Sequence, residues 1–240
     1  MTFRMILIAM AVTLILVQPS SAQISHDAWS TILKSHVSSS GNVDYSGILK
    51  DKSSLDQYLN LLEDHPPAST WSVNDRKAYW INAYNAFTIS LILQNYPVKS
   101  IKDIGGFFKS PWDIEFINIG GTSYTLNHIE HKILRKEFSD PRIHFAIVCA
   151  SRSCPNLRNE AFESTKLDQQ LDEQAKSFIN DPVKNHITSD EIEISKIFGW
   201  FENDFTKQGS LIDFLNKYSK IKINPNASVS NMRYDWNLNE

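Results

Sequence analysis

Residues 74–94 constrain the fold more than any other part of the chain. Ala, Leu, Ile and Phe dominate this stretch, Asn74 is a suitable N-cap, and Tyr96-Pro97 follow its end. When the stretch is projected at 100° per residue, apolar side chains lie on every side. The sequence therefore predicts a long helix that is buried in the centre of a domain.

Two amides lie on one face of this predicted helix. Asn82 and Asn85 project to the same side as Ile89, with Ala78 and Ala86 beside them. An unpaired buried amide costs about 1–3 kcal/mol. We therefore expect both asparagines to have hydrogen-bond partners inside the protein.

The remaining elements are short, and helices alternate with hairpins. Helices are predicted at residues 24–37, 55–62, 126–136, 165–180, 198–205 and 211–217. Strand pairs are predicted at 115–126 and 186–195, extended chain at 43–45, a buried strand at 143–148, and an irregular tail at the end. Regular β-α-β spacing is missing, so the predicted class is α+β: one compact domain whose helices pack on a small, mainly antiparallel sheet.

The first residues have the pattern of a secretion signal. Arg4 precedes a continuous apolar run at residues 5–17, and small residues fill positions 20–22. Such a run is too short to span a hydrocarbon core of about 30 Å. We therefore expect residues 1–22 to be a cleavable signal and 23–240 to be a single globular domain, periplasmic or secreted, without a membrane span.

Composition narrows the classes of partner. The chain has 24 Lys and Arg against 27 Asp and Glu, a formal net charge of -3, so no nucleic-acid partner is expected. Thirteen Phe, eight Tyr and six Trp provide ample volume for a core. The two cysteines, Cys149 and Cys154, are too few for a disulfide scaffold.

The predicted helix at 126–136 carries two groups that can do chemistry. Glu130 projects near the centre of its apolar stripe, His131 lies at the margin, and His128 points the other way. A carboxylate on a core face must be paired, protonated or used in a site. Two interpretations of Glu130 stay open: a capping box with Asn127 as the N-cap, or a role in a site.

Cys149 follows the predicted strand, and loops after strands often carry reactive groups. Strand alternation places His144 on the opposite face from Cys149, so His131 is the better candidate base. A thiol needs a neighbouring base or cation to become a nucleophile near neutral pH. The candidate catalytic centre is Cys149 with His131, oriented by Glu130 or by an asparagine, Asn82 or Asn85.

Several segments resemble motifs of the domain-of-unknown-function 547 (DUF547) family. They are VDYSGIL, WINAYNAFTISLI, LNHIEHKILR, HFAIVCASRSCPNLR, KIFGWFENDF and YDWNLNE, in the expected order from Val43 to Glu240. The resemblance implies that the family's motif positions are occupied by Trp80, Asn82, Asn85, Glu130, His131, Cys149, Ser151, Cys154 and Pro155. Ser151 and Arg152 of the cysteine turn, together with Trp80, are the candidates for binding a substrate. The resemblance supplies no activity.

Two function hypotheses follow from these residues. The first is a thiol-dependent hydrolase or transferase that acts on peptide-like or amide substrates, with Cys149 as the nucleophile and no cofactor. The second is a non-enzymatic module that binds a small-molecule or peptide-like ligand, with a Cys149–Cys154 disulfide holding its turn. Closing so short a loop would stabilise the fold by roughly 2 kcal/mol. A metal site from His128, Glu130, His131 and the cysteines is disfavoured, because the histidine spacing differs from that of helical zinc sites.

Overall fold

The computed structural model describes residues 23–106 and 109–240. The predicted secretion signal at residues 1–22 lies outside the described residues. Among the helices that are described, none combines the length and the apolar character needed to cross a membrane.

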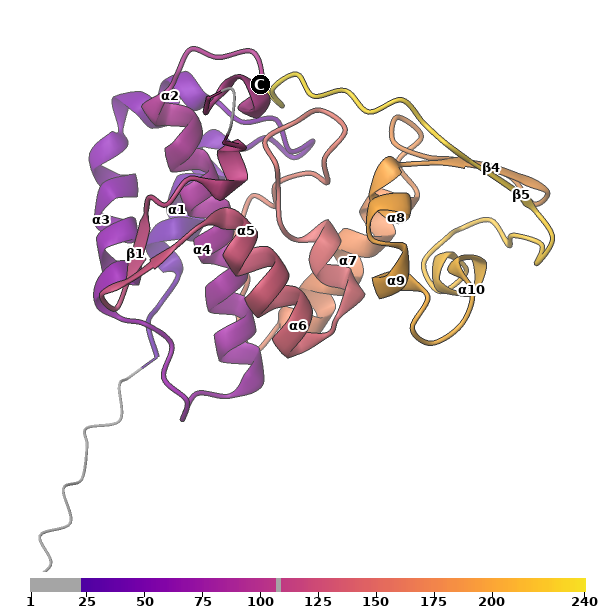
Figure 1. The fold of residues 1–240 in the computed structure, drawn as a ribbon, viewed down its shortest axis with the longest axis horizontal. Coiled ribbons are helices and arrows are strands. Elements are labelled where there is room, and N and C mark those ends of the chain that lie inside the picture. The colour runs from indigo at the N-terminus through magenta and orange to yellow at the C-terminus, as the bar shows by residue number, and fades with distance from the viewer. Residues whose placement is uncertain (1–22, 107–108) are drawn as a thin grey trace, which may run out of the picture.

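Four helices form the first half of the fold. They are α1 (Asp27–His36), α2 (Tyr45–Lys50), α3 (Lys52–Asp64) and α4 (Val73–Gln94). Every residue of α4 from Lys77 to Leu93 is buried, which confirms the predicted central helix. Its N-cap is Ser72 rather than Asn74, because the Ser72 hydroxyl accepts from the backbone N–H of Asp75 in a capping box. Figure 1 shows α4 between α3 and the rest of the molecule.

The second half contains short elements around a cluster of phenylalanines. The helices are α7 (Leu167–Ile179), α8 (Lys196–Trp200), α9 (Glu202–Phe205) and α10 (Leu211–Leu215), and the strands are β3 (His186–Ile187), β4 (Glu191–Ile194) and β5 (Ser228–Asn231). The core here gathers Phe145, Phe178, Phe198, Phe205 and Phe214, with ring centroids 5.0–6.2 Å apart.

The strands form two small sheets. A hairpin joins β1 (Ile117–Ile119) to β2 (Thr122–Tyr124), and the second sheet has the order β3-β4-β5. Pairing is antiparallel except between β4 and β5, which run parallel. Both predicted hairpins and the α+β class are confirmed. The tail was expected to be irregular, but β5 pairs with an edge of the second hairpin.

The segment 126–138 is one continuous helix with a π-helical middle. It comprises α5 (Leu126–His128), a π-helical turn (Ile129–Leu134) and α6 (Arg135–Phe138). The N-cap is Thr125, whose hydroxyl accepts from the N–H of His128 at 2.9 Å, so the predicted capping box with Asn127 is wrong. Insertions of π-helix often occur at functional sites, and both Glu130 and His131 lie in this one.

The predicted strand at 143–148 is wrong. Pro141–Phe145 form a 3-10 helix, which Asp140 caps by accepting from the N–H of Arg142, and no strand follows. The apolar run is buried without a strand partner. The alternation that separated His144 from Cys149 therefore does not exist.

Two further 3-10 turns lie at Ile101–Asp103 and Pro111–Asp113. The stretch predicted to be extended at 43–45 ends sooner than expected, because α2 begins at Tyr45 with Asp44 as its cap.

The two amides of α4 replace the missing strand partner. Asn85 donates to the carbonyl of Ala146 at 2.9 Å and accepts from the N–H of Val148 at 3.0 Å. Asn82 makes the same pair of bonds with both backbone groups of Phe162, at 2.8 and 2.9 Å. The expectation that both asparagines have internal partners is confirmed, and each holds an irregular segment against the central helix.

The end of the chain returns to the first half of the fold. In Figure 1 the yellow tail after β5 runs back to the C-terminus beside α2. Three of its backbone bonds join the cysteine turn: Arg152 N–H to Asn237 O, Ser153 N–H to Asp235 O, and Asn239 N–H to Ala150 O. We call residues 234–240 the C-terminal strap.

We call the two hydrogen bonds of Asn85 to the backbone of Ala146 and Val148 the Asn85 clasp. The clasp predicts that a single substitution at Asn85 lowers stability strongly. Asn85→Ala leaves the carbonyl of Ala146 and the N–H of Val148 buried without partners, so we expect the free energy of unfolding to fall by about 2–4 kcal/mol. Urea denaturation measures the change. Asn60→Ala, at an exposed position of α3, is the control and should change stability by less than about 0.5 kcal/mol. Equal effects of the two substitutions would contradict the clasp.

Candidate active site

A pocket of about 210 Å³ lies where the two halves of the fold meet. Its lining comes from α4, the π-helical turn, the segment after the 3-10 helix, α8 and the C-terminal strap. The residues with polar groups that line it include Tyr84, Asn127, Glu130, His131, His144, Cys149, Cys154 and Tyr234. The structure thus places the candidate residues Cys149, His131 and Glu130 in the lining of one pocket, together with His144.

Three hydrogen-bonding groups converge on the sulfur of Cys149. The hydroxyls of Ser151 and Tyr234 both lie 3.2 Å from Sγ, and the Cys154 sulfur lies 2.9 Å from it. Hydroxyls and a thiol stabilise a thiolate by donating to it. Cys149 is partly exposed, so a molecule in the pocket can reach the sulfur.

These contacts shift the pKa values of the two cysteines in opposite directions. Burial raises the pKa of Cys149, but hydrogen bonds from Cys154, Ser151 and Tyr234 outweigh it and lower the pKa to about 7. Burial, together with the hydrogen bond to Cys149, raises the pKa of Cys154 well above that of an ordinary thiol. Near neutral pH, a large fraction of Cys149 is therefore thiolate, whereas Cys154 remains a thiol.

The residue after the nucleophile candidate has an unusual backbone. Ala150 is fully buried and has φ of 55°, in the left-handed region that residues with a Cβ rarely adopt. Its carbonyl accepts from Asn239 of the C-terminal strap, which helps to hold this conformation. Strained backbone of this kind concentrates at functional sites.

Tyr234 was not recognised as a site residue from the sequence. It lies 85 residues after Cys149, and nothing in its local pattern distinguishes it from a core aromatic. The strap carries it to the cysteine turn, where its hydroxyl contacts both Cys149 and Ser151. The only sequence signal was the position of Tyr234 at the start of the closing motif, YDWNLNE.

The tautomer of His131 follows from its neighbour. Its Nδ1 lies 2.9 Å from a guanidinium nitrogen of Arg135, and because arginine only donates, Nδ1 accepts. Burial and the nearby charge of Arg135 lower the pKa of His131. The ring is therefore neutral with its proton on Nε2. No hydrogen bond joins it to Cys149 within the described part of the chain.

His144 is the second histidine of the pocket, and the sequence argument had set it aside. Its Nε2 lies 2.8 Å from Oδ2 of Asp204, and its ring stacks on Phe201 at 4.0 Å. Bonds from His144 and Arg135 keep the pKa of Asp204 far below its usual range, so the carboxylate is ionised and His144 donates from Nε2. Burial lowers the pKa of His144, so the ring is neutral with Nδ1 unprotonated.

Glu130 is the carboxyl group of the pocket. Its Oε2 accepts from the buried Tyr84 hydroxyl at 3.1 Å. Burial raises the pKa of Glu130 to about 7, and the negative charge of Cys149 adds to the rise. A carboxyl group with such a pKa can give or take a proton near neutral pH.

The other predicted site residues lie at the edge of the pocket or away from it. Asn82 and Asn85 bond backbone groups and not His131. Ser151 is buried against Cys149. Trp80 packs edge-on against Tyr79 and Tyr124 in the core, at centroid distances of 5.2 and 5.4 Å. Arg152 is exposed on the turn and is not in the pocket lining as far as the structure is described.

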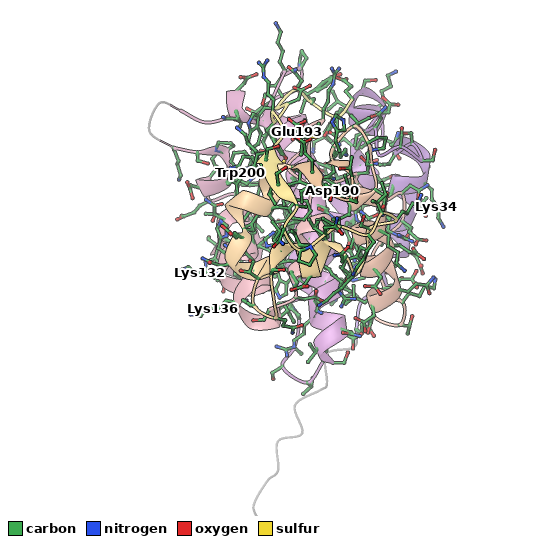
Figure 2. The ribbon with its side chains drawn as sticks, turned by 90° about the vertical axis from the view of Figure 1, so that its right-hand side faces the viewer. Lys34, Lys132, Lys136, Asp190, Glu193 and Trp200 are labelled. Atoms are coloured by element: carbon green, nitrogen blue, oxygen red, sulfur yellow. The ribbon has the colours of Figure 1, made fainter. Side chains whose placement is uncertain are left out.

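Aromatic rings form one wall of the pocket. Trp236 packs edge-on against Trp112 at 5.8 Å and stacks with Trp200 at 5.7 Å, and Tyr234 lies 4.6 Å from Trp236. Trp200 is 48% exposed, and Figure 2 shows it on the same side of the molecule as Lys132 and Lys136. The wall offers a flat apolar surface beside the cysteine sulfur.

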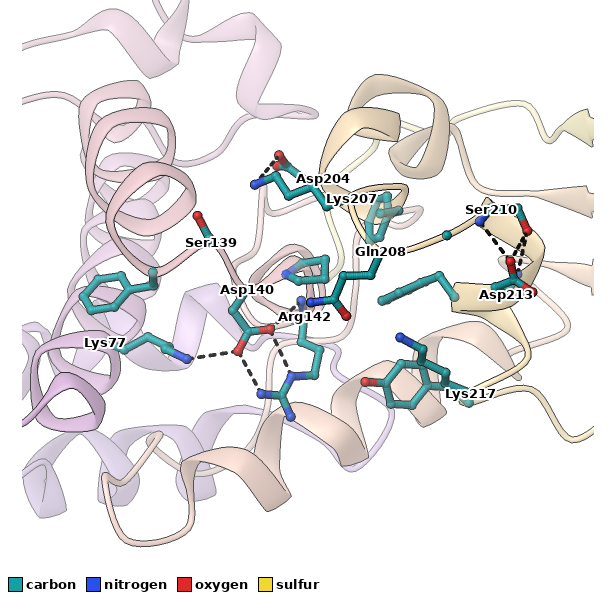
Figure 3. Close-up of a pocket in the computed structure, with 16 residues that line it drawn as sticks. Lys77, Ser139, Asp140, Arg142, Asp204, Lys207, Gln208, Ser210, Asp213 and Lys217 are labelled. Atoms are coloured by element: carbon teal, nitrogen blue, oxygen red, sulfur yellow. Dashed lines mark hydrogen bonds and ion pairs between the residues drawn. The ribbon is translucent and has the colours of Figure 1, made fainter.

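A second, more polar cleft of about 360 Å³ adjoins this site through Asp204. Figure 3 shows Asp140 between Lys77 and Arg142, and Lys207 directed at Asp204. Asp204 contacts both sites. Its Oδ1 faces Lys207 in this cleft, and its Oδ2 accepts a hydrogen bond from His144 of the cysteine pocket. Neither site offers a metal centre, since no group of three or more His, Cys, Asp or Glu in the described residues is arranged to hold an ion.

Comparison with protein families identifies the central part of the chain. Residues 68–179 match the family model described as protein of unknown function, DUF547. This segment is a DUF547 region. No curated protein and no solved structure matches the chain. The DUF547 region contains α4, Glu130, His131 and both cysteines, whereas Tyr234 and Asp204 lie beyond it.

The contact between Tyr234 and Cys149 predicts a change in thiol titration. Tyr234→Phe removes one donor to the thiolate, so we expect the pKa of Cys149 to rise by about one to two pH units. Because only the thiolate reacts, the pH midpoint of iodoacetamide alkylation at Cys149, with labelled sites mapped by mass spectrometry, reports this shift. Tyr218→Phe, which removes a hydroxyl bonded to Asp172, should leave the midpoint unchanged. A midpoint unaffected by Tyr234→Phe would show that Tyr234 does not stabilise the thiolate.

Proposed function

We propose that the protein is a thiol-dependent hydrolase or transferase acting outside the cytoplasm on amide or peptide-like substrates, with Cys149 as its nucleophile. The observation that carries the proposal is the convergence of Ser151, Tyr234 and Cys154 on the Cys149 sulfur at an aromatic-lined pocket. These hydrogen-bonding groups stabilise the thiolate before a substrate arrives, so no separate base is required to take its proton. The predicted signal at residues 1–22 supports export.

Glu130 suits the transfer of protons in this reaction. As the Cys149 thiolate attacks the carbonyl carbon, a carbon–sulfur bond forms, and the oxyanion collapses as the carbon–nitrogen bond breaks. Protonated Glu130 gives its proton to the departing amine. Its carboxylate then takes a proton from water, or from an acceptor alcohol or amine, as that molecule attacks the thioester. The thiolate and the protonated carboxyl group are both restored.

His131 has a different part in the proposal from the one that the sequence suggested. The bond from Arg135 occupies Nδ1, and the remaining Nε2–H can only donate. We therefore assign His131 the donation of a hydrogen bond to the substrate oxygen that becomes negative, rather than the role of base. Such a donor stabilises the tetrahedral intermediate. The His144–Asp204 pair is the alternative base, because Nδ1 of His144 carries a lone pair and the carboxylate favours its protonated ring.

The aromatic wall favours a substrate with an apolar group next to the bond that is cleaved. Trp112, Trp200 and Trp236 offer flat surface and no charge, and the exposed Trp200 gives access from solvent. A substrate with an uncharged, flat or apolar acyl group would bury that surface. Burial of apolar area favours binding by about 25 cal/mol per Å².

A second candidate function rests on one distance. The sulfurs of Cys149 and Cys154 lie 2.9 Å apart, so a small movement would join them in the disulfide of a non-enzymatic binding module. A permanent disulfide removes the nucleophile. Counting free thiols after equilibration with reduced glutathione separates the two functions, because the permanent disulfide of the module stays closed and leaves no free thiol, whereas the hydrolase then has two.

The proposal predicts a covalent acyl intermediate on Cys149. Incubation with p-nitrophenyl esters and p-nitroanilides of apolar acyl groups should add one acyl mass at Cys149, detected by mass spectrometry of the intact and the digested protein. Cys149→Ala should abolish the adduct and the turnover, and Glu130→Gln should slow release of the acyl group about 100-fold or more. Urea denaturation establishes that both variants are folded.

Cys154→Ser is the matched control for this experiment. It changes the other sulfur to a hydroxyl that still donates, so it should keep the adduct. Acylation that persists in folded Cys149→Ala, or that is lost equally in both cysteine variants, would overturn the proposal.

A further inference from the structure

The two cysteines differ in access as well as in acidity. Cys149 is partly exposed, whereas Cys154, which also lines the pocket, is only 3% exposed. Their sulfurs are 2.9 Å apart, and a disulfide bond of about 2.05 Å requires them to approach by less than about 1 Å. An exposed thiolate beside a buried thiol has the arrangement needed for two successive exchange steps.

We propose that Cys149 and Cys154 also carry out thiol–disulfide exchange with peptide-borne disulfides, Cys149 attacking and Cys154 resolving the mixed disulfide. This activity goes beyond the proposed hydrolysis, because it needs no acyl substrate and uses a residue, Cys154, that the hydrolytic steps do not require to react.

The first step uses the thiolate that the site already holds. The sulfur of Cys149 attacks one sulfur of the external disulfide, RSSR, and a new sulfur–sulfur bond forms. The old bond breaks, and RS⁻ leaves and takes a proton from water. Cys149 is then bonded to the SR group in a mixed disulfide, and the step involves no net oxidation or reduction.

The first step removes two effects that keep Cys154 protonated, and this favours the second step. Part of the high pKa of Cys154 comes from its hydrogen bond to the Cys149 thiolate and from the charge of that thiolate. Both disappear when Cys149 is bonded to SR. Cys154 then gives its proton to water, attacks the Cys149 sulfur and expels the second RS⁻, which takes a proton from water. The pair has given two electrons to RSSR and has become a Cys149–Cys154 disulfide.

The surroundings of Cys154 stabilise its thiolate once it forms. The backbone N–H of Cys149 donates to the Cys154 sulfur at 2.9 Å. The buried ammonium of Lys184 donates to the Cys154 carbonyl and to Asn156, and its charge lowers the pKa of Cys154. The same two groups make Cys154 a good leaving group when an external thiol attacks Cys149, so the exchange is reversible.

The test follows sulfur alone and uses oxidised glutathione as the probe. Reduced wild-type protein is mixed with it, quenched at intervals with a maleimide, and weighed by mass spectrometry. We expect wild type to pass to the intramolecular disulfide with little glutathione adduct. Cys154→Ser should instead accumulate the mixed disulfide at Cys149, with its release slowed at least about tenfold, and Cys149→Ser should form neither.

Equilibration in glutathione redox buffers completes the experiment. The wild-type disulfide should open as the proportion of reduced glutathione rises. An adduct as long-lived in wild type as in Cys154→Ser would overturn the proposal, as would a disulfide that stays closed in every buffer. Cys154→Ala, verified as folded by urea denaturation, repeats the trapping without a hydroxyl at the position. Because no acyl substrate is present, failure here leaves the acyl adduct on Cys149 as a separate question.

Discussion

The structure depends on a central helix that supplies hydrogen bonds to backbone with no strand partner. Helix α4 is buried on every side, and two of its side chains, Asn82 and Asn85, each satisfy a carbonyl and an N–H of another segment. The Asn85 clasp ends one residue before Cys149. The chain can therefore leave regular structure at the cysteine turn, inside the protein, without leaving polar groups unpaired.

The C-terminal strap, together with the Asn85 clasp, holds the cysteine turn in place. Its backbone bonds hold the turn from Ala150 to Ser153, and its Tyr234 hydroxyl reaches the Cys149 sulfur. The candidate nucleophile is thus fixed from two sides by parts of the chain that are distant in sequence. Since Tyr234 and Asp204 lie outside the DUF547 region at residues 68–179, that region alone lacks two groups of the site.

The sequence was sufficient where one element could be judged by itself. The all-round apolar pattern of α4 predicted its burial, and glycine and polar turns located both hairpins. The buried run at 143–148 could not be distinguished from a strand, because an amide on another helix supplies its backbone bonds. That error removed His144 from consideration, and its partner Asp204 is 60 residues away.

The candidate site was predictable in part for the same reason. Cys149, His131 and Glu130 lie in motifs that stand out in the sequence, and they line one pocket. What each group can do depends on contacts that only folding creates, such as the bond from Arg135 that fixes the tautomer of His131. Apart from its place in the closing motif, Tyr234 had no sequence signal, because its role comes from the path of the strap.

The central claim is that the folded protein holds Cys149 as a thiolate at neutral pH. The most direct measurement is the ultraviolet absorbance of the thiolate, at about 240 nm, in reduced wild-type protein as a function of pH, with Cys149→Ala subtracted. The account predicts a single thiolate that forms with a midpoint at about 7. A midpoint at or above the ordinary thiol value of about 8.5 would contradict it.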